Sequence, residues 1–259
     1  MLPTPCFVFS DAHLGAVPDA VEASVLSFLR RAKRQAKSLI INGDLFDFWF
    51  EWRHVMPRKG FRVIAALADL REAGVALRWH AGNHDGWGGE LLRRDIGLDY
   101  SNGPFRGAIG GWRALVHHGD GLRGDADKSY RRWARVLRHP WSIAAYRWIH
   151  PDVGTALALG TSATSRAHND HDEGAGLRDV AFAMMGRANG PSLVIFGHSH
   201  SRALLPSPSG GVYGNPGAWF DDPVYLRIDD DRVSLVRHQG SAEGDVLDVR
   251  DLPAEESGR

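Results

Sequence analysis

The sequence contains a single cysteine, Cys6, among its 259 residues. One thiol excludes an internal disulfide framework and is typical of a reducing compartment. Cys6 lies in the apolar run Cys6-Phe7-Val8-Phe9, so we expect it to pack in a core. No segment approaches the ~20 consecutive apolar residues that a membrane-spanning helix needs. The first residues also lack the basic and apolar regions of a signal peptide, and we expect a cytoplasmic protein.

The chain also lacks a net charge, since 31 lysines and arginines balance 31 aspartates and glutamates. The absence of an overall positive field argues against nucleic acid as a partner. The charge is nevertheless uneven, because residues 123–138 are strongly basic and the tail beyond Glu243 is acidic. Hydrophobic residues make up 43% of the chain, which suits one large domain or a domain with an inserted subdomain.

Short apolar runs alternate with helical patterns through the first half of the chain. The apolar runs predict buried strands at 6–9, 39–41, 75–79, 114–116 and 193–196, and the helical spacing predicts helices over 19–37 and 60–73. This alternation favours a layered α/β fold. In such folds, functional sites form from the loops at the carboxyl ends of the strands.

The pattern changes between Gly121 and Pro191, where helical spacing dominates. We predict helices over 128–138, 140–149, 152–166 and 177–188, and we interpret residues 122–190 as a helical insertion over the strand ends of a domain spanning 1–239. Short strands are predicted near 212–213, 224–228 and 233–236. Residues 240–259 contain few apolar side chains, and we expect them to form a mobile acidic tail.

Polar residues of the kinds that bind metal ions follow five of the predicted strands. They are Asp11, His13, Asp44, Asn83, His118, His198 and His200. Carboxylate and amide oxygens combined with imidazoles suit Mn²⁺, Fe²⁺ or Zn²⁺. Seven donors are too many for one ion and fit two ions that share a carboxylate, about 3.5–4 Å apart, which can activate water and hold a phosphoryl oxygen. Glycines at 43, 82, 119 and 197 are expected to allow tight turns beside the ions.

Taken in order, these motifs resemble the signature of the calcineurin-like metallophosphoesterases. The matching elements are Asp-x-His at 11–13, Gly-Asp-x-x-Asp at 43–47, Gly-Asn-His-Asp at 82–85, His118, and Gly-His-x-His at 197–200. The resemblance implies a four-layer fold of the α/β (α+β) class, a β-sandwich flanked by helices, with a helical cap insertion. It implies one metal ion on Asp11, His13, Asp44 and His200, and a second on Asp44, Asn83, His118 and His198. It also implies that His84 acts on a phosphate oxygen or the leaving group, and that Asp47 orients the His84 ring.

A narrower resemblance is carried by the segments SDAHLG, NGDLFDFWFEW and HHGDGL, together with the aromatic insertion. These segments are similar to the UDP-2,3-diacylglucosamine pyrophosphatases. The resemblance implies release of UMP and 2,3-diacylglucosamine 1-phosphate in lipid A biosynthesis, with two Mn²⁺ ions as cofactors. It further implies a peripheral enzyme of the inner membrane whose insertion covers the acyl chains. One branch of these enzymes has arginine after the motif asparagine, whereas this chain has His84, as a second branch does.

Several residues outside the metal motifs are candidates for contact with a substrate. They are Lys128 and Arg166 for diphosphate or glucosamine groups, and Tyr130, Trp133 and Trp49 for the wall of a pocket. Ordinary core packing is an equal alternative for the aromatic residues. The arginines between 131 and 138 form either a solvated face or a contact with anionic lipid headgroups. Residues 168–172 resemble a metal-binding tract, but a solvated loop is the favoured interpretation.

Two alternative functions stay open at this point. The first is a metallophosphoesterase that acts on a soluble phosphomonoester, a diester or a nucleotide. The second is a metal-binding scaffold without turnover, which uses the insertion to bind a partner. The sequence leaves the native metal and the oligomeric state open.

Overall fold

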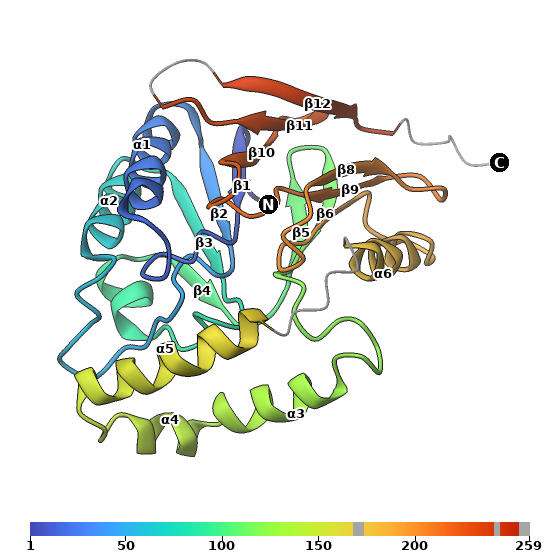
Figure 1. Ribbon diagram of the computed structural model, residues 1–259. Helices are drawn as coiled ribbons and strands as arrows, with labels where there is room; N and C mark the ends of the chain where they lie inside the picture. The colour runs from blue at the N-terminus through green and yellow to red at the C-terminus, as the bar shows by residue number, and fades with distance from the viewer. Residues whose placement is uncertain (168–173, 241–243, 254–259) are drawn as a thin grey trace.

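Two β-sheets face each other in the computed structural model, which describes residues 1–167, 174–240 and 244–253, with the side chains of 161–167 excepted (Figure 1). The seven-stranded sheet has the order β12-β11-β10-β1-β2-β3-β4. Its strands are β1 (Cys6–Phe9), β2 (Ser38–Asn42), β3 (Ala76–His80), β4 (Asp99–Ser101), β10 (Val224–Ile228), β11 (Arg232–Arg237) and β12 (Asp245–Asp251). The five-stranded sheet has the order β5-β6-β7-β9-β8. Its strands are β5 (Phe105–Ile109), β6 (Trp112–Val116), β7 (Leu193–Ile195), β8 (Ala203–Pro206) and β9 (Val212–Asn215).

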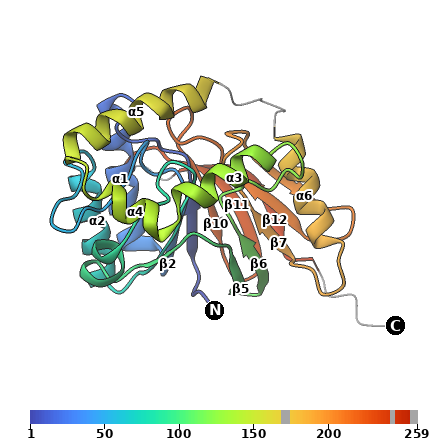
Figure 2. The same ribbon diagram turned by 90° about the horizontal axis from the view of Figure 1, so that it is seen from below.

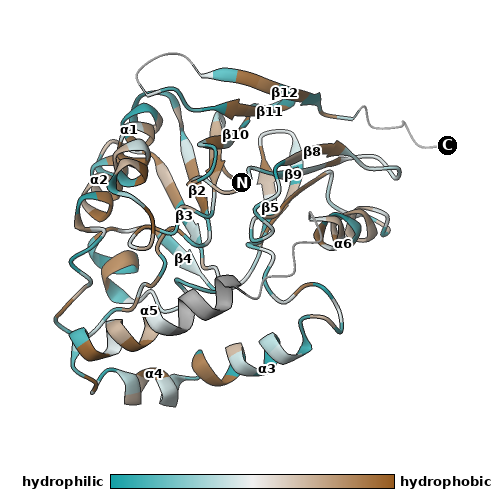
Figure 3. Ribbon diagram, viewed as in Figure 1, coloured by the Kyte–Doolittle hydropathy of each residue, from teal (hydrophilic) through white to brown (hydrophobic). Residues whose placement is uncertain are grey.

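Helices cover the outer face of each sheet and complete four layers. Helices α1 (Asp19–Gln35) and α2 (Phe61–Glu72) pack on the seven-stranded sheet, and α6 (Ala175–Met185) packs on the five-stranded sheet. Figure 3 shows hydrophobic residues along the strands and on these helices. The α/β fold class and the helix-flanked sandwich predicted from the sequence are therefore confirmed.

Strand β1 shows how the sequence builds these layers. Successive side chains of a strand point to opposite faces. Cys6 and Val8 therefore lie in the core between the two sheets, while Phe7 and Phe9 lie in the core shared with α1. All four side chains are buried, and the packing position expected for Cys6 is confirmed.

The central strands of both sheets are parallel, so their carboxyl ends meet at one edge of the sandwich. In the first sheet β1, β2, β3 and β4 run parallel. In the second sheet β6, β7 and β9 run parallel. The loops that leave these ends carry the polar motifs, as the alternation of strands and helices predicted.

Three helices lie across this edge: α3 (Lys128–Leu137), α4 (Pro140–Tyr146) and α5 (Pro151–Ala167) (Figures 1 and 2). We call them the helical segment. The predicted insertion, 122–190, also included α6, but α6 packs on the sandwich through Leu177, Ala181 and Met185. Its apolar face matches the outer face of the second sheet, so α6 belongs to the sandwich layers rather than to the segment. None of the helices within the described residues is long and apolar enough to cross a membrane.

The carboxyl-terminal residues differ from the expected mobile tail. Residues Asp245–Asp251 form β12, which pairs antiparallel with β11 at the edge of the seven-stranded sheet. Most of the β12 side chains are exposed, so the strand depends mainly on backbone hydrogen bonds, which composition does not report. Residues 241–243 and 254–259 of the expected tail lie outside the described residues.

Candidate metal centre

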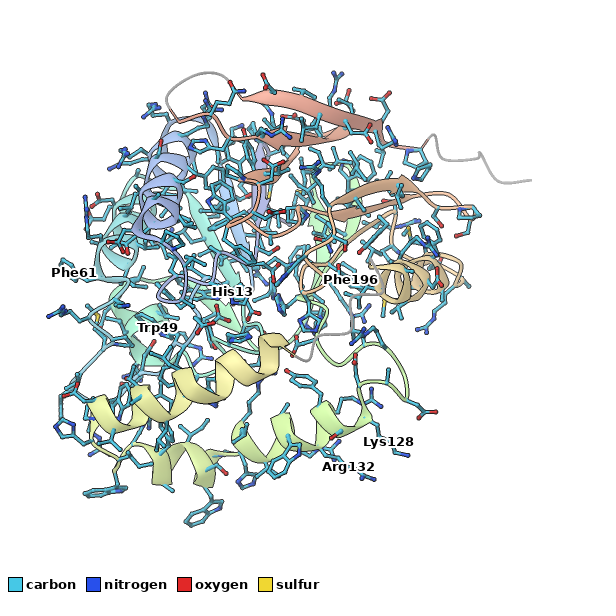
Figure 4. All side chains as sticks on the ribbon, viewed as in Figure 1. His13, Trp49, Phe61, Lys128, Arg132 and Phe196 are labelled. Carbon is cyan, nitrogen blue, oxygen red and sulfur yellow. The ribbon has the colours of Figure 1, made fainter. Side chains whose placement is uncertain are left out.

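The loops after β1, β2, β3, β6 and β7 bring the predicted ligands to one place. His118 Nε2 lies 3.2 Å from Asp44 Oδ2, and His200 Nε2 lies 3.4 Å from Asp11 Oδ1. His13 Nε2 lies between the two carboxylates, 3.8 Å from Asp44 Oδ2 and 4.0 Å from Asp11 Oδ1. Figure 4 shows His13 above the helical segment, at the centre of this region.

Ligand atoms close enough to share an ion form overlapping groups. One group joins Asp11, His13 and His200, and another joins Asp44, His118 and His198. A third group joins His13 and Asp44 with His84. Asp44 belongs to two of these groups and lies 3.8 Å from His13 of the remaining one, so the arrangement is compatible with the two ions that the resemblance implies.

Backbone strain is concentrated at these residues. Positive φ angles occur at Asp11 (54°), His13 (46°), Asp44 (52°), His198 (62°) and His200 (57°). Residues other than glycine seldom adopt this left-handed conformation, which costs on the order of 1–3 kcal/mol each and is concentrated at functional sites. The surrounding hydrogen bonds hold the strain in place, because the amides of Asp11 and His13 donate to Gly43 O and Asp44 O, at 3.1 and 2.9 Å.

The glycines beside the ligands have two different functions. Gly43 has a positive φ of 85°, and a Cβ there would lie 2.3 Å from His118 Nδ1. A Cβ on Gly82 would lie 2.1 Å from Asp44 Oδ1, although Gly82 is not among the glycines with positive φ. The tight turn expected from the sequence is found at Gly43, while Gly82 is needed for close approach of the Asp44 carboxylate.

Hydrogen bonds around the ligands fix their orientation. His118 Nδ1 donates to Asn42 O at 2.8 Å, which leaves Nε2 directed at Asp44. Asp85 accepts from the amides of Gly82 and Leu45, at 2.7 and 2.8 Å, and joins the loops after β2 and β3. Burial, together with the neighbouring Asp44 carboxylate, raises the pKa of Asp85 to about 7.

The donors present fit divalent cations. Burial would raise the pKa of Asp44, but His118 and His84 hold that pKa well below its usual range. Burial would likewise lower the pKa of His118, but Asp44 and Asp11 raise it well above the ordinary value. Asn83 Oδ1 and His13 Nε2 are buried and make no hydrogen bond among the described residues. Bound cations would neutralise the carboxylates and provide partners for these atoms.

Asp47 lies between two histidines of the site. Its Oδ1 is 3.6 Å from His84 Nδ1 and 3.6 Å from His13 Nδ1. The Asp47 carbonyl oxygen lies 3.0 Å from His84 Nδ1, which places that nitrogen as the donor. The contact with His84 agrees with the orienting role implied by the resemblance, whereas the contact with His13 was not anticipated.

A cavity of about 230 Å³ adjoins the ligands. Its lining residues come from the aromatic loop, the loop after β3 and the helical segment: Phe48, Asn83, His84, Trp87, Tyr130, Trp133, Ala134, Leu137, Arg138 and Ala158. A second cavity of about 310 Å³ is more apolar and is lined by Phe48, Phe50, Trp87, Leu137, Ser142, Ile143, Tyr146, Leu157 and Ala158. The two cavities share Phe48, Trp87, Leu137 and Ala158 as walls, so an apolar space lies next to the metal ligands.

The candidates for substrate contact divide into several groups. Tyr130 and Trp133 line the first cavity. Lys128 is exposed at the start of α3 and lines neither of the two cavities (Figure 4). The side chain of Arg166 and the whole tract 168–172 lie outside the described parts of the structure.

Trp49 does not occupy the predicted position in a pocket wall. Its side chain is fully buried and stacks on Phe46 with ring centroids 4.8 Å apart. Neighbouring residues of the extended loop point to opposite sides, so Phe48 and Phe50 face the cavities while Trp49 faces the core. The packing alternative was the correct one for Trp49.

Two polar residues that contact Tyr130 were missed as candidates. Arg138 was assigned to a basic face, yet its Nη2 donates to Gly82 O at 2.8 Å. Asp120 accepts from the Tyr130 hydroxyl and lies 3.4 Å from Arg138 Nη2. The segment HHGDGL contains Asp120, and its resemblance to the pyrophosphatases could have identified this residue as a candidate. Nothing in the sequence linked Asp120 to Arg138.

A family model described as calcineurin-like phosphoesterase matches residues 4–202. The chain belongs to the calcineurin-like phosphoesterase family. The matched region contains all of the predicted metal ligands.

Curated relatives share one name, UDP-2,3-diacylglucosamine hydrolase. A protein of Porphyromonas gingivalis is 35% identical over 161 residues, 61% of this chain and 62% of the relative. One of Nitrosococcus oceani is 30% identical over 201 residues, 76% of this chain and 79% of the relative. One of Neisseria meningitidis serogroup B is 30% identical over 241 residues, 90% of this chain and 97% of the relative.

Solved structures are more distant. A dimetal phosphatase from Danio rerio aligns with a TM-score of 0.46 and 12% identity, over 93% of this chain and 98% of that chain. These values are low, and membership of the family rests on the family model and the curated relatives.

Proposed function

We propose that the protein hydrolyses the diphosphate bond of UDP-2,3-diacylglucosamine and releases UMP and 2,3-diacylglucosamine 1-phosphate. The observation that carries the proposal is the apolar cavity beside the cluster of metal ligands. A soluble nucleotide or phosphoprotein needs no such cavity, whereas a substrate with acyl chains does. The shared name of the curated relatives supports the same substrate.

In this proposal the predicted ligands hold two divalent ions, and Mn²⁺ is the ion we expect. The first ion takes Asp11, His13, Asp44 and His200, and the second takes Asp44, Asn83, His118 and His198. When bound, such ions act as Lewis acids that activate water and neutralise phosphate charge. The mixture of oxygen and imidazole donors fits this chemistry.

His84 acts on the scissile phosphate in this proposal. Its Nδ1 is held by the Asp47 carbonyl at 3.0 Å, and the ring lines the cavity beside Asn83. In its protonated form, His84 donates from Nε2 to a phosphate oxygen or to the oxygen of the leaving group. Asp47 keeps the ring in this orientation.

The acyl chains would enter the cavity lined by Phe48, Phe50 and Tyr146. The outer side of the helical segment would contact the membrane from which such a substrate is drawn. Trp141 is 80% exposed and Trp148 is 92% exposed, with the exposed Arg147 between them in the chain. Exposed tryptophans beside basic residues are typical of surfaces that bind the headgroup region of anionic membranes.

Identification of the product tests the proposed function. Purified protein with Mn²⁺ should release UMP from UDP-2,3-diacylglucosamine, and chelation of the metal should stop the release. Cleavage of a cyclic dinucleotide or a simple diester without UMP release would favour a soluble substrate. A metal-loaded protein that cleaves none of these compounds would favour a scaffold without turnover.

A further inference from the structure

Arg138, the residue after the last turn of α3, reaches from the helical segment to the metal centre. Its Nη2 donates to Gly82 O at 2.8 Å and lies 3.4 Å from both Asp120 Oδ2 and the Tyr130 hydroxyl oxygen. The Tyr130 hydroxyl also donates to Asp120 Oδ2. One guanidinium thus joins α3 to two separate loops of the sandwich.

Both loops carry predicted ligands of the same ion. Gly82 precedes Asn83 on the loop after β3, and Asp120 follows His118 by two residues on the loop after β6. Gly82 is also so close to Asp44 that no Cβ fits between them. A displacement of either loop would therefore change the geometry of the ion held by Asn83 and His118.

The ligands of the other ion depend on different contacts. Asp11 and His13 lie on the loop after β1, which pairs with the loop after β2 through Asp11 N to Gly43 O and His13 N to Asp44 O. Loss of the Arg138 contacts should therefore affect the two ions unequally.

The environment makes the Arg138 contacts strong. Asp120 is 8% exposed, and the Arg138 side chain is 21% exposed. Charged hydrogen bonds shielded from water are worth more than those on a surface. Helix α3 has no buried residue, so its attachment to the sandwich depends on polar contacts such as these and the bond from Trp87 Nε1 to Leu137 O, at 3.2 Å.

We propose that Arg138 is a positioning residue that couples the helical segment to the loops of Asn83 and His118, and so sets the geometry of one of the two ions. The inference rests on the proposed two-metal function and extends it. The helical segment then does more than cover a substrate, because its attachment organises half of the metal centre.

Arg138→Gln tests this inference, and Arg132→Gln is the matched control. Both variants remove one positive charge from residues 128–138, but Arg132 is exposed on the side of α3 turned away from His13 (Figure 4). The probes are Mn²⁺ itself, titrated and followed by electron paramagnetic resonance, and the small soluble diester bis(p-nitrophenyl) phosphate. Neither probe requires an acyl-chain cavity.

We expect Arg138→Gln to bind one Mn²⁺ per chain about 10- to 100-fold more weakly, the range typical of lost partners of metal ligands, and to retain the other. The signal of the coupled Mn²⁺ pair should disappear at metal concentrations that saturate the wild type. The kcat for the diester should fall by about 10-fold or more with little change in KM, and excess Mn²⁺ should restore part of it. Arg132→Gln should match the wild type in every measurement.

The inference is wrong if Arg138→Gln and Arg132→Gln have equal Mn²⁺ affinities and equal kcat values. If circular dichroism shows that Arg138→Gln does not fold, Tyr130→Phe decides the question, because it removes the hydroxyl that contacts both Asp120 and Arg138. A several-fold weakening of the same single Mn²⁺ would support the inference, and unchanged affinity would overturn it. A wild type that cleaves the diester without releasing UMP from the lipid overturns the proposed substrate alone, since the Mn²⁺ comparison stands without it.

Discussion

The Asp47 carboxylate lies 3.6 Å from Nδ1 of His13. The other ring nitrogen of His13, Nε2, faces the carboxylates of Asp44 and Asp11. A carboxylate behind a metal-binding imidazole fixes the orientation of the ring and increases its basicity. We therefore predict that Asp47→Asn weakens Mn²⁺ binding about 10-fold or more and lowers turnover. Titration with Mn²⁺ checks this, with Asp69→Asn on the exposed face of α2 as the control. Unchanged affinity would show that the His13 contact is incidental.

Asp44 is the residue on which both proposed ions depend. We predict that Asp44→Ala retains less than about 1% of wild-type turnover and loses bound Mn²⁺, because the Asp44 carboxylate lies 3.2 Å from His118 and 3.8 Å from His13, which are proposed ligands of different ions. His118→Ala should have a similar effect on turnover. Metal analysis and steady-state kinetics check both, and circular dichroism should show a native fold. Near-wild-type rates in both purified variants would contradict the hypothesis that the site holds two metal ions.

His84 should behave differently from the ligands. We predict that His84→Ala lowers turnover by about 100-fold or more and keeps both Mn²⁺ ions, because its role is to donate to the substrate. Turnover and metal content are measured on the same preparation. His84 also lies in a group with His13 and Asp44, so loss of an ion in this variant would identify it as a ligand.

His80 makes the fold sensitive to acid. Its burial, with a further contribution from Arg78 and His117, lowers its pKa from 6.5 to about 4, although the hydrogen bond from Nδ1 to Gly103 O opposes the shift. The unfolded chain therefore takes up the proton first as pH falls, and stability is lost between about pH 6.5 and pH 4. We predict a loss at pH 5, relative to pH 7, of about 2 kcal/mol from this residue.

Urea unfolding at the two pH values measures this loss. In His80→Leu the difference in unfolding free energy between pH 7 and pH 5 should shrink by about 2 kcal/mol. His54→Leu is the control, because His54 is exposed and stays in solvent when the chain unfolds. An equal pH dependence in His80→Leu and the wild type would rule out the effect.

The exposed tryptophans of the helical segment should mediate contact with membranes. We predict that the double variant Trp141→Ala/Trp148→Ala binds vesicles containing anionic phosphatidylglycerol about 10-fold more weakly than the wild type, because it loses two interfacial side chains. Phe61→Ala is the control, since Phe61 is 57% exposed but lies on α2 (Figure 4). Vesicle sedimentation measures the binding. Equal binding by all three proteins would show that these tryptophans do not mediate contact with the membrane.

The sequence predicts that these side chains gather at one edge of the sandwich, because the information for this is local. Each ligand follows an apolar strand directly, and parallel strands bring their carboxyl ends together whatever the details of the loops. The same logic located His84, since it adjoins Asn83 in the chain. The α/β layers also follow from the alternation of apolar residues within single strands such as β1.

Contacts between distant parts of the chain were not predictable in the same way. Trp49 and Phe48 are neighbours in sequence, and only the course of the loop decides which one is buried. The helical spacing of apolar residues in α6 resembles that of the helical segment, but α6 packs on the five-stranded sheet. The contact between Arg138 and Gly82 spans 56 positions, and its residue types are those of an ordinary surface helix and an ordinary turn.

The edge strand β12 shows how an acidic composition can protect a sheet. A strand at the border of a sheet presents unpaired backbone groups, on which another chain can extend the sheet. β12 carries Asp245, Asp248, Arg250 and Asp251 along this open border, and most of its side chains face solvent. Charges at such positions discourage pairing between copies of a protein. The residues that make the tail resemble an unstructured segment thus act to keep separate molecules from joining edge to edge.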